Sequence, residues 1–186
     1  MLAKTLPEWM ISAFGVPYPT SEWVRNLPPY LEVDFVRGSL CGVALGDDIE
    51  RLSFLGRADS ANEAAMGILG FSPLGLALVT HDGKLHSVTM LLTGSPGSKH
   101  KPFEGIFHVN GNRHMVPAIT TEAEAIALFG EPTVRGDQRD GETGEIWETS
   151  LRYVNGSVAC EVVFDPEGQL VEINLEPSGE GAGDGE

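Results

Sequence analysis

This 186-residue sequence has no long apolar run, only a few cysteines, and few basic residues in its C-terminal part. No apolar run approaches the roughly 20 residues that a membrane-spanning helix needs. Near the N-terminus, Pro7 and Glu8 interrupt the apolar stretch that a signal peptide would require. The composition is 41% hydrophobic, which is typical of a globular chain with a core. We therefore expect a cytoplasmic protein that makes no membrane contact.

Only two cysteines are present, Cys41 and Cys160, and they form no CxxC pattern. Neither has a neighbouring histidine or an obvious helix start that would activate its thiol. A buried pair of free thiols is therefore favoured over a disulfide, and neither cysteine is expected to act as a nucleophile.

Basic residues become rare after residue 118, which makes the charge of the chain very uneven. The net charge is −15. Residues 1–118 hold 11 acidic and 9 basic side chains, whereas residues 119–186 hold 16 acidic and only 3 basic ones. Nucleic acids and anionic membranes are bound through basic surfaces, so this charge argues against both. An acidic surface favours a basic protein partner instead, and the alternative is that it serves solubility alone.

Catalytic and phosphate-binding motifs are also missing. The sequence contains no GxSxG, HExxH, P-loop or Rossmann fingerprint. A hairpin turning at Asp82-Gly83 would place His86 opposite Val79 and on the same face as His81. Two such histidines can hold a metal, but histidines beside a turn are more often plain surface residues. We therefore predict no catalytic residue, no cofactor and no metal site, and a chain that is not an enzyme.

The two halves of the chain repeat one pattern, about 74 residues apart. Each begins with a tight turn between short extended runs, at Arg37-Gly38 and at Asn110-Gly111. A two-residue turn at Asn110-Gly111 pairs residue 109 with 112 and 107 with 114. His108 and His114 then point to opposite faces, so they are not expected to form a site.

A helix with a cap, an apolar stripe and a stop follows the turn in each half. The stop is a glycine, Gly56 or Gly130, suited to the left-handed residue that ends a helix. The capping boxes and stripes match in order and spacing. Their residues are Asp47, Glu50, Leu52 and Leu55 in the first half, and Thr121, Glu124, Ile126 and Phe129 in the second.

A three-stranded meander completes each half, so the predicted fold class is α+β. We expect two tandem copies of a hairpin, a helix and a three-stranded antiparallel meander, preceded by an N-terminal helical extension with helices over Leu6–Gly15 and Ser21–Asn26. The predicted organisation is an extension over 1–32, copy one over 33–92, a joint over 93–101, copy two over 102–176 and a disordered acidic tail over 177–186.

The segments Gly46–Gly56 (GDDIERLSFLG) and Thr120–Pro132 (TTEAEAIALFGEP) resemble tandem-repeat α+β binding proteins. That class includes the β-lactamase inhibitor proteins and the SmpA/OmlA-like lipoproteins. The size and acidity of the chain are also similar to those of bacterial immunity proteins. The chain departs from the first two groups because it has no signal, no lipobox and no cysteine pair within a copy. The resemblance implies a protein-binding module.

The segment 131–148 (EPTVRGDQRDGETGEIWE) has the most unusual local composition. It would offer carboxylates to a basic partner, with an aromatic anchor at its end. Two alternatives are a solvated connection that ends in the first core residue of a strand, and a calcium loop, although the register of an EF-hand is missing. The candidate partner-binding residues are Asp137, Asp140, Glu142, Glu145, Trp147 and Glu148.

The leading functional hypothesis is a non-enzymatic binding protein, an intracellular inhibitor or immunity protein for a basic protein partner. Two alternatives stay open. One is a small-molecule-binding or enzymatic domain with a cleft between the two copies. The other is a structural accessory protein that assembles into a larger particle.

Overall fold

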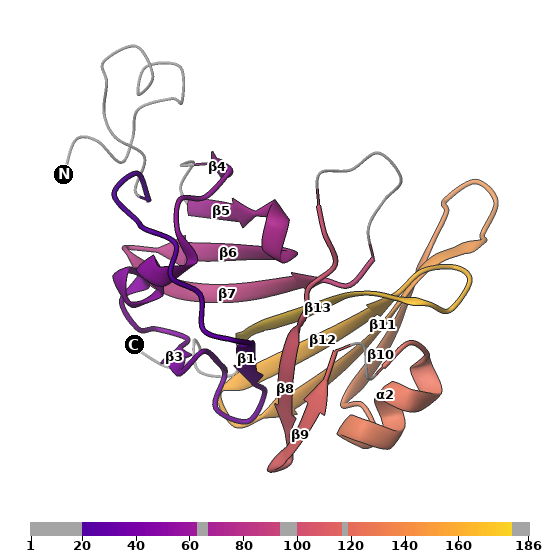
Figure 1. Ribbon diagram of the computed structural model, residues 1–186. Helices are drawn as coiled ribbons and strands as arrows, with labels where there is room; N and C mark the ends of the chain where they lie inside the picture. Colours follow the sequence, from indigo (N-terminus) through magenta and orange to yellow (C-terminus); the bar gives the residue numbers. More distant parts are fainter. Residues whose placement is uncertain (1–19, 63–66, 94–99, 117–118, 180–186) are drawn as a thin grey trace, which may run out of the picture.

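Two β-sheets make up most of the structure, a computed structural model that describes residues 20–62, 67–93, 100–116 and 119–179 (Figure 1). The strands are β1 (Leu31–Asp34), β2 (Ser39–Leu40), β3 (Val43–Ala44), β4 (Ser60–Asn62), β5 (Gly67–Phe71), β6 (Leu76–His81), β7 (Lys84–Leu91), β8 (Gly105–Val109), β9 (Asn112–Met115), β10 (Val134–Arg139), β11 (Ile146–Asn155), β12 (Val158–Phe164) and β13 (Leu170–Pro177). Among these residues, the smaller sheet has the order β3-β2-β1-β8-β9 and the larger has the order β10-β11-β12-β13-β7-β6-β5-β4. β1 and β8 pair in parallel, and the other pairings are antiparallel.

The predicted α+β class is wrong, because strands dominate the chain. They hold 49% of the residues that the structure describes, against 12% in helices. In the described ranges the only α-helix is α2 (Glu122–Phe129), and the short turn η3 (Ser72–Leu74) is a 3₁₀ helix. The segment that was expected to match α2 in the first half is the 3₁₀ helix η2 (Ile49–Leu55). A helix of the same kind in each half was therefore an incorrect expectation.

The spacing of its apolar residues is compatible with η2 as a 3₁₀ helix. Its buried side chains are Ile49, Leu52 and Leu55, which recur every three residues. A 3₁₀ helix has three residues per turn, so this spacing keeps all three side chains on one side. In an α-helix, with 3.6 residues per turn, the same residues would spread progressively around the axis.

The predicted capping box of the second half is confirmed at the start of α2. The Thr121 hydroxyl accepts a hydrogen bond from the Glu124 amide at 3.4 Å, and the Glu124 carboxylate accepts one from the Thr121 amide at 3.2 Å. Gly130 ends the helix with a positive φ of 90°, although its ψ of −166° lies outside the left-handed helical region. In the first half the cap of η2 is Asp48 rather than the predicted Asp47, and its carboxylate accepts from the Glu50 amide at 2.9 Å.

The predicted N-terminal helical extension is wrong in the part that the structure describes. Leu6–Gly15 lies outside the described residues. Over Ser21–Asn26 a turn is followed by irregular backbone. Pro28 and Pro29 come soon after, and a proline disfavours helical backbone at the residue before it.

Trp23 fixes this irregular segment to the core. It is only 7% exposed, and its ring stacks on Phe71 with centroids 6.4 Å apart. Its indole N–H donates to the Glu50 carboxylate at 3.0 Å, so the polar atom of this buried side chain has a partner. The segment is therefore held by packing rather than by helical hydrogen bonds.

The three predicted hairpin turns differ in outcome. At Arg37-Gly38, Asp34 pairs with Ser39, so the turn covers the four residues 35–38 and is not a two-residue turn. At Asn110-Gly111 both residues have positive φ, and the predicted pairing of 109 with 112 and of 107 with 114 is confirmed. At Asp82-Gly83 the turn is present, but a bulge between Val79 and Thr80 places Ser87 opposite Val79. The predicted pairing of His86 with Val79 is therefore wrong, because a bulge inserts one extra residue into a strand.

The larger sheet has two different faces, because successive side chains of a strand point to opposite sides. One row of paired residues across four of its strands is fully buried, and it consists of Leu151, Val162, Ile173 and Met90. The adjacent row points the other way and is half-buried, and it consists of Arg152, Glu161, Asn174 and Thr89. We call the face of this second row the open face.

The smaller sheet and α2 lie on the buried side of the larger sheet (Figure 1). Phe107 of β8 connects two aromatic contacts, an edge-on one with Phe35 at 5.0 Å and a stacked one with Phe103 at 5.9 Å. A Cβ added to Gly38, in the turn after β1, would lie 2.7 Å from the Val158 side chain. The core is therefore the layer between the two sheets, and it joins both halves of the chain.

Candidate functional site

The predicted acidic segment forms a hairpin at one edge of the larger sheet. β10 is the edge strand, and it pairs with β11 from Val134↔Arg152 to Arg139↔Ile146. Trp147 is the extra residue of a bulge, because Glu148 pairs with Gln138 and Ile146 pairs with Arg139. Trp147 is 50% exposed, so the interpretation of it as a first core residue is wrong. Asp137 pairs with Thr149 in the row next to the Gln138–Glu148 pair, so Asp137 and Glu148 point to opposite faces and the six candidate residues do not share one surface.

Two of the six candidates are engaged within the hairpin itself. The Asp137 carboxylate accepts a hydrogen bond from the Thr149 hydroxyl at 3.1 Å and lies 3.4 Å from Arg135. Asp140 accepts from the amides of Glu142 at 2.9 Å and Thr143 at 2.7 Å. These amide hydrogen bonds lower the pKa of Asp140, because they favour its charged form. Asp137 and Asp140 therefore build the hairpin.

The remaining acidic candidates lie at two different places. Glu142 and Glu145 are exposed in the turn between β10 and β11. Glu148 lies on the open face, where its carboxylate accepts a hydrogen bond from the Gln138 amide at 2.9 Å. Glu142 and Glu145 in the turn are thus separated from Glu148 on the sheet, although the sequence placed all three in one group.

Glu148 belongs to a group of acidic residues on the open face. Its pKa is raised by partial burial and by the nearby negative charges of Glu172 and Glu161. Glu161 on β12 lies opposite Arg152, and Glu172 on β13 lies opposite Val163. Three adjacent strands therefore bring together carboxylates that are up to 24 residues apart in the sequence.

Polar contacts order the side chains of this acidic group. The Asn174 amide donates to Glu172 at 2.7 Å and accepts from the Thr89 hydroxyl at 2.6 Å. Arg152 forms an ion pair with Glu176. Glu161, Glu172 and Glu176 were missed as site candidates. Their signal in the sequence is the alternation of charged with apolar residues in the last two strands, which shows that they share a face only once the register is known.

The open face changes character toward the first-half strands. On β5, β6 and β7 it presents uncharged side chains, namely Ile68, Ala77, Val79, Ser87, Thr89 and Leu91. Ile68 is 43% exposed, and the paired Val79 is partly exposed. One continuous sheet surface therefore has an uncharged, partly apolar part next to an acidic part.

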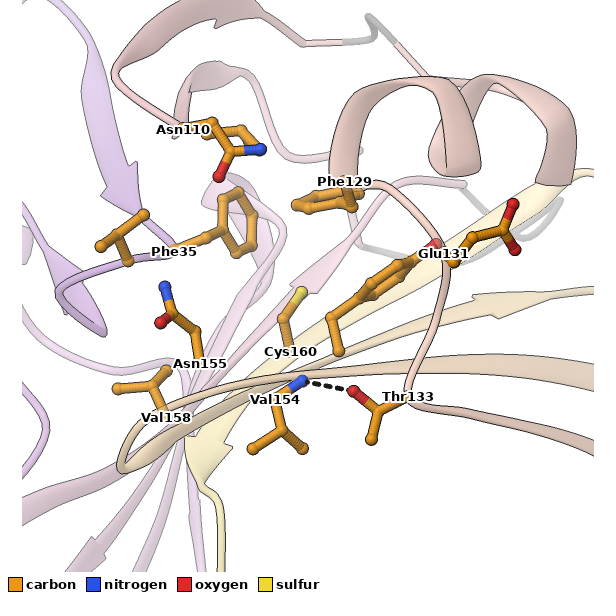
Figure 2. Close-up of a pocket in the computed structure, with 12 residues that line it drawn as sticks. Phe35, Asn110, Phe129, Glu131, Thr133, Val154, Asn155, Val158 and Cys160 are labelled. Atoms are coloured by element: carbon orange, nitrogen blue, oxygen red, sulfur yellow. Dashed lines mark hydrogen bonds between the residues drawn. The ribbon is translucent and has the colours of Figure 1, made fainter.

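A pocket of about 320 Å³ lies between the smaller sheet, the end of α2 and the β11–β12 hairpin (Figure 2). Three aromatic rings form its walls. Phe129 contacts Phe35 edge-on at 5.2 Å and Tyr153 at 5.1 Å. Asn110 and Asn155, from two different hairpin turns, lie on either side of Phe35 at the rim, and the Cys160 thiol points toward the rings (Figure 2). We call this the aromatic pocket.

Burial controls the chemistry of the polar groups in this pocket. The Tyr153 hydroxyl is buried and has no hydrogen-bond partner in the described structure. Desolvation, followed by the charges of Cys160, Glu122 and Glu131, raises the pKa of Tyr153 to about 12. Desolvation also raises the pKa of the Cys160 thiol. Both groups are therefore neutral at physiological pH, and Cys160 is not an activated nucleophile.

Cys41, His81 and His86 carry the other thiol and imidazole groups that the sequence pointed to. Cys41 is also free, as predicted, but it is only partly buried, and desolvation raises its pKa. His81 and His86 line a second pocket, of about 350 Å³, together with Arg37 and Lys84. Basic neighbours repel a metal cation and suit an anion instead. Within the described ranges, no group of three or more potential metal ligands is found, and no helix is long and apolar enough to cross a membrane.

Comparison with known proteins gives similarities of fold only. No protein-family model matches the chain, and no curated protein matches it. The structure is similar to that of a DUF4309 family protein (YjgB) of Bacillus subtilis, with a TM-score of 0.47 and 12% identity over 74% of this chain and 84% of that one. It is also similar to a cysteine-rich secretory protein of Staphylococcus aureus, with a TM-score of 0.46 and 13% identity over 81% of this chain. The match spans about half of that second protein (52%).

Proposed function

We propose that this chain is a non-enzymatic protein-binding module that contacts a basic protein partner through the open face of its larger sheet. The observation that carries the proposal is the group Glu148, Glu161 and Glu172, which lies on three adjacent strands with Arg152 already paired to Glu176. Uncompensated carboxylates on a broad surface attract a basic partner and speed its association.

The uncharged part of the same face supports a protein as the partner. Ile68, Val79 and Leu91 offer partly exposed apolar area beside the acidic group. Protein interfaces combine an apolar centre with charged residues around it, whereas a small ion would need only the charges. The partner surface that fits is therefore basic along one side and apolar along the other.

We further propose that the chain acts in the cytoplasm, as an inhibitor or immunity protein. The two free thiols are compatible with a reducing compartment. In this proposal, binding itself is the activity.

A pull-down from the native source, followed by calorimetry with the captured protein, tests the proposal. We expect a basic partner at low salt and its loss at about 0.5 M salt, because salt screens exposed charges over distances of about 10 Å or less. Recovery of no basic partner at low salt would contradict the proposal.

A pair of charge-matched variants locates the contact. Glu161→Lys with Glu172→Lys reverses two charges on the open face, and Glu142→Lys with Glu145→Lys reverses two charges in the β10–β11 turn. We expect the first pair to weaken binding about a hundredfold and the second less than about fivefold, because close charge pairs contribute far more than distant ones. Equal losses would show that only net charge matters, and a larger loss in the turn variant would move the site to the turn.

A further inference from the structure

The aromatic pocket is not used by the proposed protein contact. It opens among Tyr153 and Cys160, whose side chains point to the buried side of the larger sheet, away from Glu161. Its walls come from both halves of the chain, with Phe35 following β1 and Phe129 ending α2. A volume of about 320 Å³ is at the lower end of the range for small-molecule sites.

The rim of the pocket offers free hydrogen-bonding groups. The Asn110 and Asn155 carboxamides flank Phe35 (Figure 2), and neither side chain forms a hydrogen bond within the described part of the chain. A carboxamide presents donors and an acceptor side by side. That pair matches a ring edge on which an acceptor and a donor are adjacent, as asparagine does with adenine.

The charge of the lining restricts the ligand further. No lysine, arginine or histidine is among the described residues that line the pocket. The one charged lining residue is Glu131, and its carboxylate lies on the far side from Asn110 and Asn155 (Figure 2). A phosphate or carboxylate on the ligand would therefore meet no compensating charge in a chain of net charge −15.

We propose that the aromatic pocket binds an uncharged, planar heteroaromatic ring of the purine class. The ring lies against the partly exposed rings of Phe129 and Tyr153, and its edge is hydrogen-bonded by Asn110 and Asn155. Stacking on aromatic side chains supplies affinity for any flat ring, and the two carboxamides select rings with paired donors and acceptors.

Calorimetry with the full chain tests this proposal, with adenine as the probe. Adenosine monophosphate and indole are the comparators, because the first adds a phosphate and the second keeps a flat bicyclic shape without an acceptor. We expect adenine to bind, and each comparator to bind at least about tenfold more weakly. Amide chemical shifts in an NMR titration should change at Asn110, Val154 and Asn155. Absence of adenine binding, equal binding of either comparator, or shifts located elsewhere would overturn the proposal.

Three variants separate the site from its surroundings. Asn155→Ala and Asn110→Gly each remove one carboxamide, and glycine is chosen at residue 110 because its φ is +50°. We expect each to weaken adenine binding about tenfold with an unchanged thermal unfolding midpoint. Asn112→Ala, in the same hairpin as Asn110 but outside the pocket, is the matched control and should bind as the parent does. Full binding by both Asn155→Ala and Asn110→Gly would overturn the assignment.

Discussion

The two halves of the larger sheet agree on one face and differ on the other. The strands β5-β6-β7 and β11-β12-β13 are both antiparallel meanders, and they join where β7 pairs with β13. Toward the core, Leu78 in the first half and Leu151 in the second are equally buried, at 0% exposure. On the open face, the middle strand of the first half presents Val79, whereas the middle strand of the second half presents Glu161. Packing dictates the buried side, whereas the open side can carry either apolar or charged residues.

Truncation of the buried faces should have the largest effect and should be the same in both halves. Leu78→Ala and Leu151→Ala each remove a fully buried side chain, so each is expected to lower the free energy of unfolding by about 3 kcal/mol. Urea denaturation measures this loss. Val79→Ala, on the open face of β6, is the control and should cost less than about 1 kcal/mol. A loss at Val79 as large as that at Leu78 would show that the open face is covered.

The next largest difference in stability loss is expected between two glycines in the connections before β6 and β13. Gly75, before β6, has a φ of +63°, and an added Cβ would lie 2.4 Å from the Phe103 amide nitrogen. Gly168, before β13, has a φ of +76° with nothing within 4 Å of an added Cβ. Gly168→Ala therefore measures backbone strain alone, about 1 kcal/mol. Gly75→Ala adds a steric clash, and we expect a total of about 3 kcal/mol in thermal or urea unfolding. Equal losses would mean that the 101–103 segment moves aside freely.

A smaller difference is expected between the two helix caps. Thr121→Ala breaks the capping box of α2 and should cost about 1 kcal/mol in urea denaturation. Asp48→Ala removes the cap of η2, which is anchored by three buried side chains, so its cost should be about half as large. The expectation fails if Asp48→Ala proves the more damaging of the two.

The smallest effect concerns the charge on the open face. The folded-state pKa of Glu148 is raised above its ordinary value of 4.5, so its contribution to stability is largest below pH 4.5 and declines as the pH rises through the folded-state pKa. Glu148→Gln should therefore be more stable than the parent at pH 7, by about 0.3 kcal/mol given solvent screening, and should lose this advantage below pH 4.5.

Asp140, in the same hairpin as Glu148, should make stability depend on pH in the opposite direction. Its pKa is lowered from 3.8, so its stabilising contribution is present above that pH and declines as the pH falls through the folded-state pKa. Asp140→Asn should be less stable than the parent at pH 7, and the two should converge in acid. Urea unfolding at pH 3, 5 and 7 measures both variants. If Glu148→Gln and Asp140→Asn change the free energy of unfolding at pH 7 in the same direction, the assignment of these two environments is contradicted.

Local signals predicted local structure well in this chain. The capping box at Thr121 and the register of the Asn110-Gly111 hairpin follow from a few neighbouring residues, and both are confirmed. The η2 segment was misjudged because a spacing of three residues suits two kinds of helix, and tertiary packing selects between them. The register of β6 and β7 was misjudged because a bulge leaves no clear mark in the sequence.

The candidate sites show the same limit. Asp137 to Glu148 was singled out because its residues are adjacent in the chain, yet the strand register divides it between two faces and a turn. The group of Glu148, Glu161 and Glu172 depends on the pairing of three strands. The aromatic pocket depends on Phe35, Phe129 and Tyr153, which are up to 118 residues apart. No local pattern connects such residues, because contacts of this kind arise only when the sheets pack.

The sequence by itself determined the charge imbalance, the capping box of α2, the Asn110-Gly111 turn and the alternation that makes each strand two-faced. These properties depend on residues within a few positions of one another, where backbone geometry leaves few choices. Only the tertiary structure decided that the two meanders join at β7 and β13, that η2 is a 3₁₀ helix, and that the acidic group and the aromatic pocket lie on different sides of one sheet. Those outcomes depend on how distant apolar faces bury one another, and many arrangements of the same local elements would satisfy the local rules equally well.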